Sequence, residues 1–204
     1  YQGPTQVFSV AQDDRGILYV GLFGGVRAYD GGSWRTIATP HNSIVRALAK
    51  GTDGRIYVGE VGDFGYLQPD AQGAMRFVSL LEFVPPPDRS FQDVRTIQVT
   101  PEGVYFQARE ILIRLTPDGQ GWRYKSWKPA QRFLSTFYEG GSLYLSTPGD
   151  GLQRLTGDTL QTLALPGLQS EPTSSINALF SLAENSAQLL LGTRNGQLFT
   201  LEGD

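Results

Sequence analysis

The same pattern of residues occurs five times along this chain of 204 residues. Each copy holds an apolar strand, a turn with Gly or small polar residues, a second strand that usually carries Tyr, another turn and a further strand. The second strands end at matching positions that lie 38, 48, 39 and 46 residues apart: Gly21, Gly59, Gln107, Ser146 and Gly192. A repeat of about 40 residues made of short strands is typical of a β-propeller, in which each repeat forms one four-stranded antiparallel sheet, or blade. The sequence therefore predicts an all-β fold with five repeats.

Alternation of apolar and polar residues, with turn residues between the runs, divides each repeat into strands A to D. Strand A is predicted at residues 7–11, 44–49, 94–99, 133–138 and 176–182. Strand B is predicted at residues 17–20, 56–58, 104–107, 143–146 and 189–191. Strand C is predicted at residues 26–29, 66–68, 112–115, 152–155 and 197–201. Strand D, the shortest and most polar, is predicted at residues 34–37, 75–78, 122–126 and 159–163.

These strands predict a single propeller domain over residues 1–204. Its blades are expected at about residues 5–38, 43–80, 93–128, 131–165 and, as a partial blade, 175–204. The last blade lacks its outer strand, and a sheet edge without a partner leaves backbone groups unpaired. We therefore expect the chain to be part of a larger propeller; closure of a five-bladed ring by residues 1–6 is the alternative.

Composition argues against several classes of function. The 17 basic and 20 acidic residues give a net charge of −3, whereas nucleic-acid-binding modules usually have a basic excess. There is no Cys and only one His, His41, so thiolate metal sites and a Ser-His-Asp arrangement have no support. No apolar run is long enough to span a bilayer. We expect no cofactor, no metal, no nucleic acid and no membrane contact by this region.

The first repeat is similar to the two-component-regulator propeller repeat over residues 13–30, which read DDRGILYVGLFGGVRAYD. Residues 53–59 match the same pattern, and residues 191–193 keep its Leu-Gly-Thr. The family's strand-B Trp is Tyr or Leu in all five copies here. In that family the propellers are typically periplasmic sensor regions placed ahead of a membrane span and a histidine kinase or diguanylate cyclase. The resemblance therefore implies a periplasmic or extracytoplasmic sensor.

The repeated Tyr and Gly residues are expected to be structural. Tyr19, Tyr57, Tyr105 and Tyr144 recur at one strand position, which suits a packing layer between blades. Glu60 and Asp63 could pair as acid and base or hold calcium, although their turn lacks the alternating ligands of a calcium loop. A solvated polar turn is the favoured interpretation of these two carboxylates.

The variable lengths between repeats come from two insertions, at residues 81–93 and 166–175, which both join strand D to the next strand A. In propellers the D–A and B–C loops emerge on one face, around the mouth of the central channel, where binding residues concentrate. Pro85–Pro87 is expected to keep the first insertion stiff and extended. We predict a ligand-binding rim made of bulky or charged loop residues: Phe23, Glu60, Asp63, Phe64, Arg89, Phe91, Arg109, Asp150, Arg194 and Asn195.

The favoured function is a non-catalytic sensor region of a bacterial signal-transduction protein, of the two-component or cyclic-di-GMP type. Its partner would be a small molecule, such as a saccharide, or a periplasmic protein, and the full-length chain could form a dimer. A propeller enzyme, a lyase or hydrolase with its site at the same mouth, is the first alternative, although the scarcity of His and Cys disfavours it. A protein-interaction scaffold is the second.

Overall fold

The computed structural model describes residues 6–165, 176–182, 188–194 and 196–202. The chain divides into two compact units, Tyr1–Trp127 and Lys128–Asp204, and each is described by itself. Both units consist of antiparallel sheets built from strands that are consecutive in the sequence.

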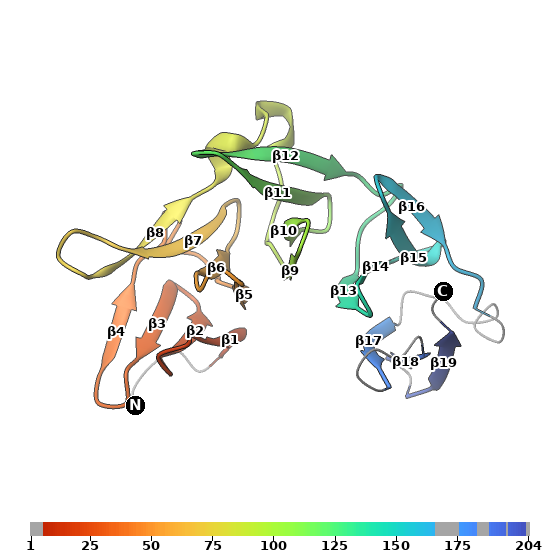
Figure 1. Cartoon of the computed structure of the whole chain (residues 1–204), viewed down its shortest axis with the longest axis horizontal. Helices are drawn as coiled ribbons and strands as arrows, with labels where there is room; N and C mark the ends of the chain where they lie inside the picture. Colours follow the sequence, from red (N-terminus) through yellow and green to blue (C-terminus); the bar gives the residue numbers. More distant parts are fainter. Residues whose placement is uncertain (1–5, 166–175, 183–187, 195, 203–204) are drawn as a thin grey trace. The chain divides into compact units, whose positions relative to one another are not determined.

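The first unit holds three four-stranded sheets, coloured from red to green in Figure 1. The first sheet contains β1 (Ser9–Gln12), β2 (Leu18–Leu22), β3 (Gly25–Tyr29) and β4 (Trp34–Ile37). The second contains β5 (Ala47–Lys50), β6 (Ile56–Gly59), β7 (Phe64–Pro69) and β8 (Met75–Ser79). Two 3-10 turns follow, η1 (Leu81–Phe83) and η2 (Pro86–Asp88). The third sheet contains β9 (Thr96–Thr100), β10 (Gly103–Gln107), β11 (Leu112–Asp118) and β12 (Gly121–Trp127).

The second unit holds one four-stranded and one three-stranded sheet. The former contains β13 (Ser135–Glu139), β14 (Ser142–Thr147), β15 (Gly151–Thr156) and β16 (Thr159–Thr162). The latter contains β17 (Ile176–Ser181), β18 (Gln188–Thr193) and β19 (Leu198–Glu202). The predicted all-β architecture, with a last repeat that lacks strand D, is therefore confirmed, and the described residues contain no helix longer than a 3-10 turn.

The strands with the core-facing residues lie where the sequence places them, but strand A begins later than predicted in the first four repeats. In the second repeat it begins at Ala47 instead of Ile44. The physical reason is that Ile44 pairs with Phe23, and the Val45 N–H donates to the Leu22 carbonyl, 2.9 Å away. These residues are extended, but they are bonded to the preceding sheet instead of to their own.

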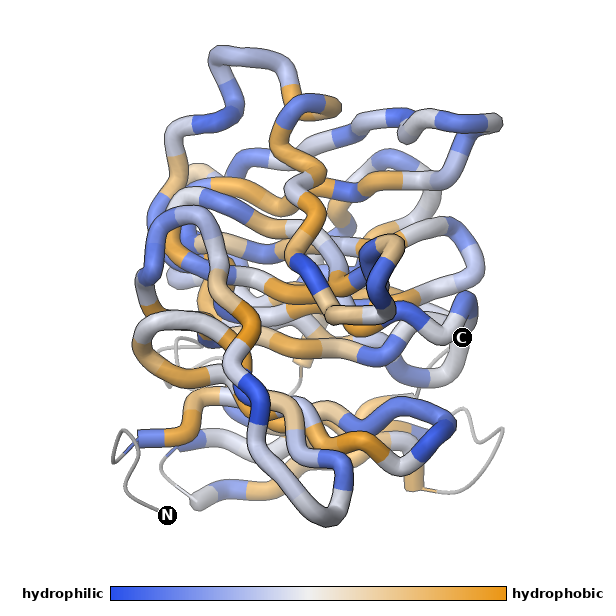
Figure 2. Tube along the Cα trace, turned by 90° about the vertical axis from the view of Figure 1, so that its left-hand side faces the viewer, coloured by the Kyte–Doolittle hydropathy of each residue, from blue (hydrophilic) through white to orange (hydrophobic). Residues whose placement is uncertain are grey.

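Within the first unit the inner strands β1, β5 and β9 pack beside one another (Figure 1). Hydrophobic residues concentrate in the strands and hydrophilic residues in the turns (Figure 2), as expected when sheets stack through their faces. The four repeated tyrosines are all buried, which confirms the predicted packing layer: Tyr19, Tyr57, Tyr105 and Tyr144.

An acidic residue in the A–B turn holds the hydroxyl of each of the first three tyrosines. Tyr19 donates to Asp13 Oδ2 at 3.2 Å, and Tyr57 donates to Asp53 Oδ2 at 3.0 Å. In the third sheet Glu102 takes the same role for Tyr105, at 2.9 Å. The ring can therefore be buried between sheets while its polar end keeps a partner.

The first long insertion does not extend as predicted. Pro86 and Pro87 instead lie in η2, and Arg89 closes the loop by donating to the carbonyls of Val84, at 2.7 Å, and Glu82, at 3.1 Å. Asp88 accepts hydrogen bonds from Tyr124 and Ser126 of β12. These bonds fold the insertion back onto the third sheet, so Pro supplies turn geometry here instead of an extended segment. The second insertion, at residues 166–175, lies outside the described residues.

Candidate functional site

The B–C turns and the connections between sheets meet at one end of the sheets in the first unit. Phe23 pairs with Ile44, and Val61 pairs in the same way with Asp93. We call residues 22–25, 38–46, 60–63, 80–95 and 108–111 the rim. The bridges confirm, for this unit, that B–C and D–A segments lie together, and they place polar residues from neighbouring sheets side by side.

A cluster of three ionisable groups occupies the rim between the first and second sheets. Glu60 is completely buried, Asp63 is 4% exposed and His41 is exposed. Their nearest ligand atoms all lie within 4.8 Å of one another. Glu60 Oε2 accepts hydrogen bonds from the hydroxyls of Thr39, at 2.8 Å, and Ser43, at 2.9 Å. Glu60 thus fixes the connection that leads into the second sheet.

Asp63 is held in a different environment. Its Oδ1 accepts the N–H of Phe64, at 2.6 Å, and the hydroxyl of Ser79, at 2.7 Å. Burial raises the pKa of Asp63, the charge of Glu60 adds to this, and the hydrogen bond from Ser79 opposes it. One imidazole and two carboxylates are also a donor set that suits a divalent cation such as Zn²⁺ or Mn²⁺. The cluster can therefore hold a proton or a cation close to Glu60.

A second cluster lies on the rim between the second and third sheets and contains mainly cations. Asp93 Oδ2 is 2.5 Å from Arg46 Nε and 3.1 Å from Arg95 Nη1. Arg46 also lies over the ring of Phe8, 5.0 Å from its centre. Arg46 and Arg95 occupy equivalent positions in their sheets. The backbone N–H of each donates to the carbonyl of the residue that ends strand B of its own sheet, at 3.0 and 2.7 Å.

Positive charge exceeds negative charge in this second cluster. Partial burial lowers the pKa of Arg95, Asp93 opposes this, and the charges of Arg109 and Arg46 lower the pKa further. Arg46 and Arg95 thus contact Asp93, and the charges of Arg46 and Arg109 both act on Arg95, with Glu110 as the other carboxylate nearby. Such an arrangement favours an anionic group, which forms strong, charge-assisted hydrogen bonds with Arg.

Five of the residues predicted for the rim lie on it with a polar or exposed side chain: Phe23, Glu60, Asp63, Arg89 and Arg109. Phe23 is 64% exposed, although it sits in a turn that pairs with the next sheet. Phe64 and Phe91 are buried instead. Phe64 stacks on Phe91 and on Phe106, with ring centres 5.8 and 4.2 Å apart, so we assign these rings to packing.

Among these five, Arg89 is committed to carbonyl groups of its own loop. The remaining predicted residues lie in the second unit. Asp150 and Arg194 are exposed beside strands of the second unit, where Thr147 donates to Asp150 at 3.4 Å. Asn195 lies outside the described residues.

Reasoning from loops alone missed Arg46, Asp93 and Arg95. The signal that could have found them is the dipeptide Val-Arg, which directly precedes strand A in both the second and third repeats, at residues 45–46 and 94–95. A cation at the same position of two consecutive repeats, next to buried Val45 and Val94, is unusual for a purely structural residue.

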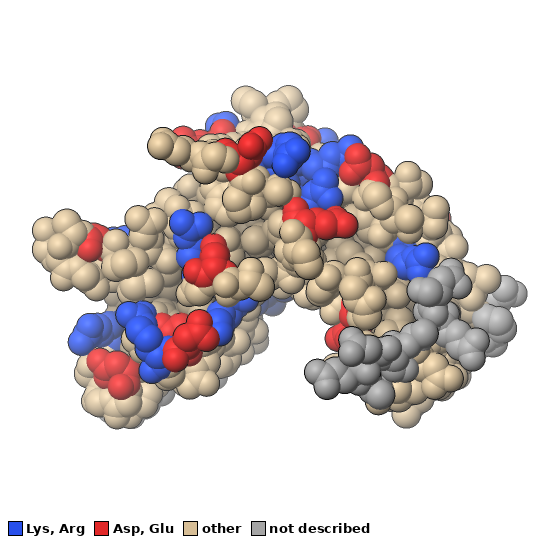
Figure 3. Space-filling view, in the orientation of Figure 1, with Lys and Arg blue, Asp and Glu red and all other residues tan. Residues whose placement is uncertain are grey.

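Charged residues are common elsewhere on the surface too. The rim therefore differs from the rest of the surface in the balance of its charges, and not in having charged residues. On the face shown in Figure 3, Lys and Arg lie intermingled with Asp and Glu. Several cations outside the rim have an acidic partner, as Arg35 has Asp30 and Arg76 has Asp70. The excess of guanidinium groups around Asp93 is a local feature.

A scan against protein-family models finds no match, and a search of curated proteins finds none either. Among solved structures, virginiamycin B lyase from Staphylococcus aureus has a TM-score of 0.70 and 13% identity, covering 98% of this chain and 71% of that protein. The extracellular domain of hybrid two component system BT3049 from B. thetaiotaomicron has a TM-score of 0.68 and 18% identity. That of BT4673 from the same organism has a TM-score of 0.61 and 20% identity.

These similarities confirm the β-propeller fold. The matches to the two extracellular domains include 98% and 100% of this chain. They include only 28% of each of those two proteins. Extracellular domains of two-component systems and a lyase thus share this fold, and the fold itself does not decide between their functions. Within the described part of the chain, no helix has the length and apolar character needed to cross a membrane.

Proposed function

We propose that this chain is a non-catalytic sensor region of a bacterial signal-transduction protein and that it binds its ligand or partner at the rim. The observation that carries the proposal is the excess of guanidinium groups around Asp93, at the ends of inner strands from two neighbouring sheets. The likeness of the fold to extracellular domains of two-component systems supports a sensor, and it supports an extracytoplasmic location.

The geometry is better suited to binding than to catalysis. Arg46 and Arg95 are fixed by Asp93, and their side chains remain 30% exposed. Guanidinium groups held in place before the ligand arrives lose less conformational freedom on binding. The exposed ring of Phe23, at another part of the rim, offers an apolar contact for a larger ligand or a protein.

The test is a binding screen with purified chain and a library of carboxylates, phosphate esters and neutral saccharides, followed by thermal shift and calorimetry. We expect anionic compounds to bind and Arg109→Gln to weaken them about tenfold, which corresponds to about 1.4 kcal/mol. The matched control is Arg123→Gln, which removes an exposed cation from outer strand β12. Equal affinity in Arg109→Gln, with a loss in Arg123→Gln, would place binding on the side of the sheets and contradict the proposal.

An enzyme remains the second candidate, because Glu60, Asp63 and His41 together resemble an acid–base or metal-binding group. The raised pKa of Asp63 would suit a general acid. The distinguishing result would be chemical conversion of a bound compound that is lost in Asp63→Asn. Binding without conversion supports the sensor.

A further inference from the structure

Two segments of the rim meet at the cluster of His41, Glu60 and Asp63. The carboxylates belong to the turn between β6 and β7, which is closed by the Glu60 N–H donating to the Asp63 carbonyl, 3.0 Å away. His41 lies in the connection from β4 to β5, and its backbone N–H donates to Glu60 Oε1 at 3.4 Å. Backbone hydrogen bonds therefore hold all three residues in place relative to one another.

The side chains of the cluster converge closely enough to share one ion. One imidazole nitrogen and one oxygen of each carboxylate all lie within 4.8 Å of one another. Three atoms with such separations have a common point within about 2.8 Å of each of them, which is 4.8 Å divided by √3. Zn²⁺ binds nitrogen and oxygen ligands at about 2.0–2.2 Å. Side-chain movements of less than about 1 Å would therefore bring all three atoms to bonding distance of one ion.

The two carboxylates of the cluster are buried without a basic partner. Glu60 is completely buried and Asp63 is 4% exposed. Within the described part of the chain, no Lys or Arg forms an ion pair with either of them. The hydrogen bonds that they accept come only from hydroxyl and backbone N–H groups, which are uncharged. Buried charges in proteins are usually paired or bound to a metal.

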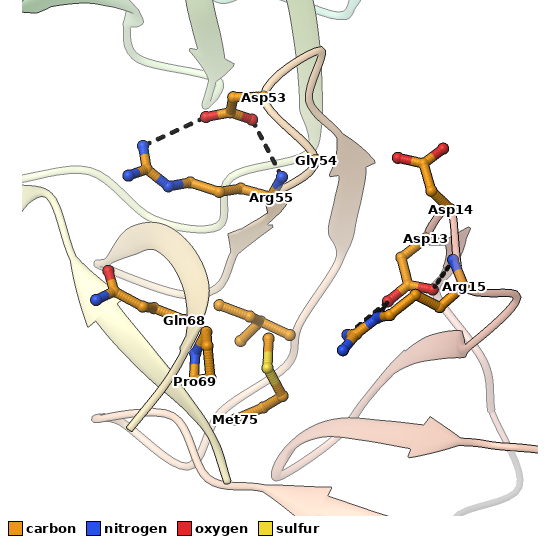
Figure 4. Close-up of a pocket in the computed structure, with 10 residues that line it drawn as sticks. Asp13, Asp14, Arg15, Asp53, Gly54, Arg55, Gln68, Pro69 and Met75 are labelled. Atoms are coloured by element: carbon orange, nitrogen blue, oxygen red, sulfur yellow. Dashed lines mark hydrogen bonds and ion pairs between the residues drawn. The ribbon is translucent and has the colours of Figure 1, made fainter. Parts of the chain in front are cut away.

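Other carboxylates of the first unit are paired with arginine. Asp13, whose side chain is 6% exposed, lies 2.8 Å from Arg15 Nη2, and Asp53 lies 3.3 Å from Arg55 Nη1 (Figure 4). On the rim itself, Asp93 has two guanidinium partners. The carboxylates of the cluster have none of these, so their negative charge favours a cation from outside the chain.

Each ligand of the cluster also keeps room for an ion. Asp63 Oδ1 accepts two hydrogen bonds, whereas its Oδ2 accepts none from the described residues. Glu60 Oε1 accepts only the long bond from the His41 backbone. A carboxylate oxygen has two lone-pair sites, so both oxygens retain acceptor capacity. The side chain of His41 is exposed, and water can therefore reach an ion from that side.

We propose that His41, Glu60 and Asp63 form a binding site for one Zn²⁺ ion, with water completing its coordination. The imidazole favours Zn²⁺ over Mg²⁺ and Ca²⁺, which prefer oxygen ligands alone. The sequence-based expectation of no metal considered each turn alone, whereas the fold adds a histidine from another connection. The bound ion would join the β6–β7 turn to the β4–β5 connection, and the site does not include the guanidinium groups around Asp93.

The chain contains a single histidine, which makes a direct test possible. In tag-free protein labelled with ¹⁵N at histidine, the imidazole signals can come only from His41. We expect a saturable shift of these signals on titration with Zn²⁺, and at least tenfold weaker binding of Mg²⁺ and Ca²⁺. Saturating Zn²⁺ should also raise the melting temperature above that measured in EDTA, because the ion binds the folded arrangement.

His41→Ala and Asp63→Asn should each weaken Zn²⁺ binding at least tenfold in calorimetry and remove the rise in melting temperature. The matched control is Glu82→Gln, which removes an exposed carboxylate of the rim outside the cluster and should bind Zn²⁺ like wild type. Melting in EDTA shows that each variant is folded. In EDTA at pH 7, Asp63→Asn should be at least as stable as wild type, because it removes a buried charge.

Zn²⁺ binding that survives both substitutions, or that falls equally in Glu82→Gln, would overturn the assignment of the ligands. Equal affinity for Ca²⁺ or Mg²⁺ would overturn the choice of ion. No shift of the His41 signals with millimolar Zn²⁺ would overturn the site. Arg109→Gln, which tests anion binding, should leave Zn²⁺ binding unchanged, so the two sites can fail independently.

Discussion

At the scale of single residues, the rim keeps two carboxylates out of water within reach of each other. Glu60 has hydroxyl donors on its Oε2, whereas Asp63 has one hydroxyl and one backbone N–H on its Oδ1. The charged groups that face Asp63 are Glu60, from the same turn, and His41, from the connection after β4. Because burial raises the pKa of Asp63, its charged form is the disfavoured one in the folded protein.

This environment makes the effect of Asp63→Asn depend on pH. The folded pKa of Asp63 lies above the unfolded value of about 3.9, so the native state binds the proton first as pH falls. As pH falls from neutral to about pH 4, the wild type therefore gains stability because Asp63 takes up a proton in the folded state. The variant has an uncharged Asn there and gains nothing. We expect the variant to be at least as stable as wild type at pH 7, with this advantage shrinking toward pH 4, in urea denaturation series.

Ser79→Ala provides the matched comparison, since it removes the hydrogen bond that opposes the raised pKa. Its stability relative to wild type should therefore improve as pH falls from 7 to 4. Parallel pH profiles for wild type and Asp63→Asn would show that Asp63 is not perturbed.

At the scale of strands and sheets, glycine at the end of strand B sets how closely neighbouring sheets approach. A Cβ on Gly59 would lie 2.5 Å from Val94 Cγ1, and one on Gly21 would lie 2.6 Å from the Val45 carbonyl oxygen. Both contacts are shorter than packed atoms tolerate. Gly21 and Gly59 are therefore required by the closeness of the next sheet. Their backbone φ angles do not require glycine.

Gly59→Ala should therefore destabilise the chain by about 1–3 kcal/mol through overpacking. Gly192→Ala is the matched control, because a Cβ at this equivalent position meets its nearest neighbours, Ala178 Cβ and Leu198 Cδ2, at 3.4 and 3.7 Å. It should change stability much less. Thermal denaturation of both variants, and of Gly59→Ala combined with Val94→Ala, measures the effect. Equal losses for the two single variants would contradict the role assigned to the contact.

Strand positions could be predicted from sequence because periodicity and turn residues report local structure. Strand B around Tyr57 and strand D around Trp34 were predicted within a residue or two of their observed bounds. The start of strand A could not be predicted, because Ile44 pairs with a turn of another sheet, and alternation along one segment does not reveal that partner. The same limit hid the burial of Phe64 and Phe91, which follows from stacking between residues far apart in sequence.

The candidate site was predicted only in part for a related reason. Exposed charge in a turn is visible in the sequence, as for Arg109, but the meeting of Arg46 and Arg95 at Asp93 depends on how two sheets are placed.

At the scale of the whole molecule, the hydrophobic core of the described residues forms clusters that each stay within one unit. One cluster joins the first and second sheets through Tyr19 and Val58, and another joins the second and third through Tyr57 and Phe106. A further cluster, around Tyr144, belongs entirely to the second unit. Since burial of apolar surface is the main stabilising contribution, the first unit contains the contacts needed to fold by itself.

We therefore expect a fragment of residues 1–127 to fold without the second unit. It should give a β-type circular dichroism spectrum, a cooperative thermal transition and dispersed amide signals. A fragment of residues 1–80 is the matched comparison, because it keeps the first two sheets but removes Phe106, on which Phe64 and Tyr57 pack. This shorter fragment should melt at least 10 °C lower or fail to fold, since losing a large aromatic contact in a core costs about 3–5 kcal/mol. An unfolded 1–127 fragment, or equal stability of the two fragments, would show that the core clusters do not set the limits of the folding unit.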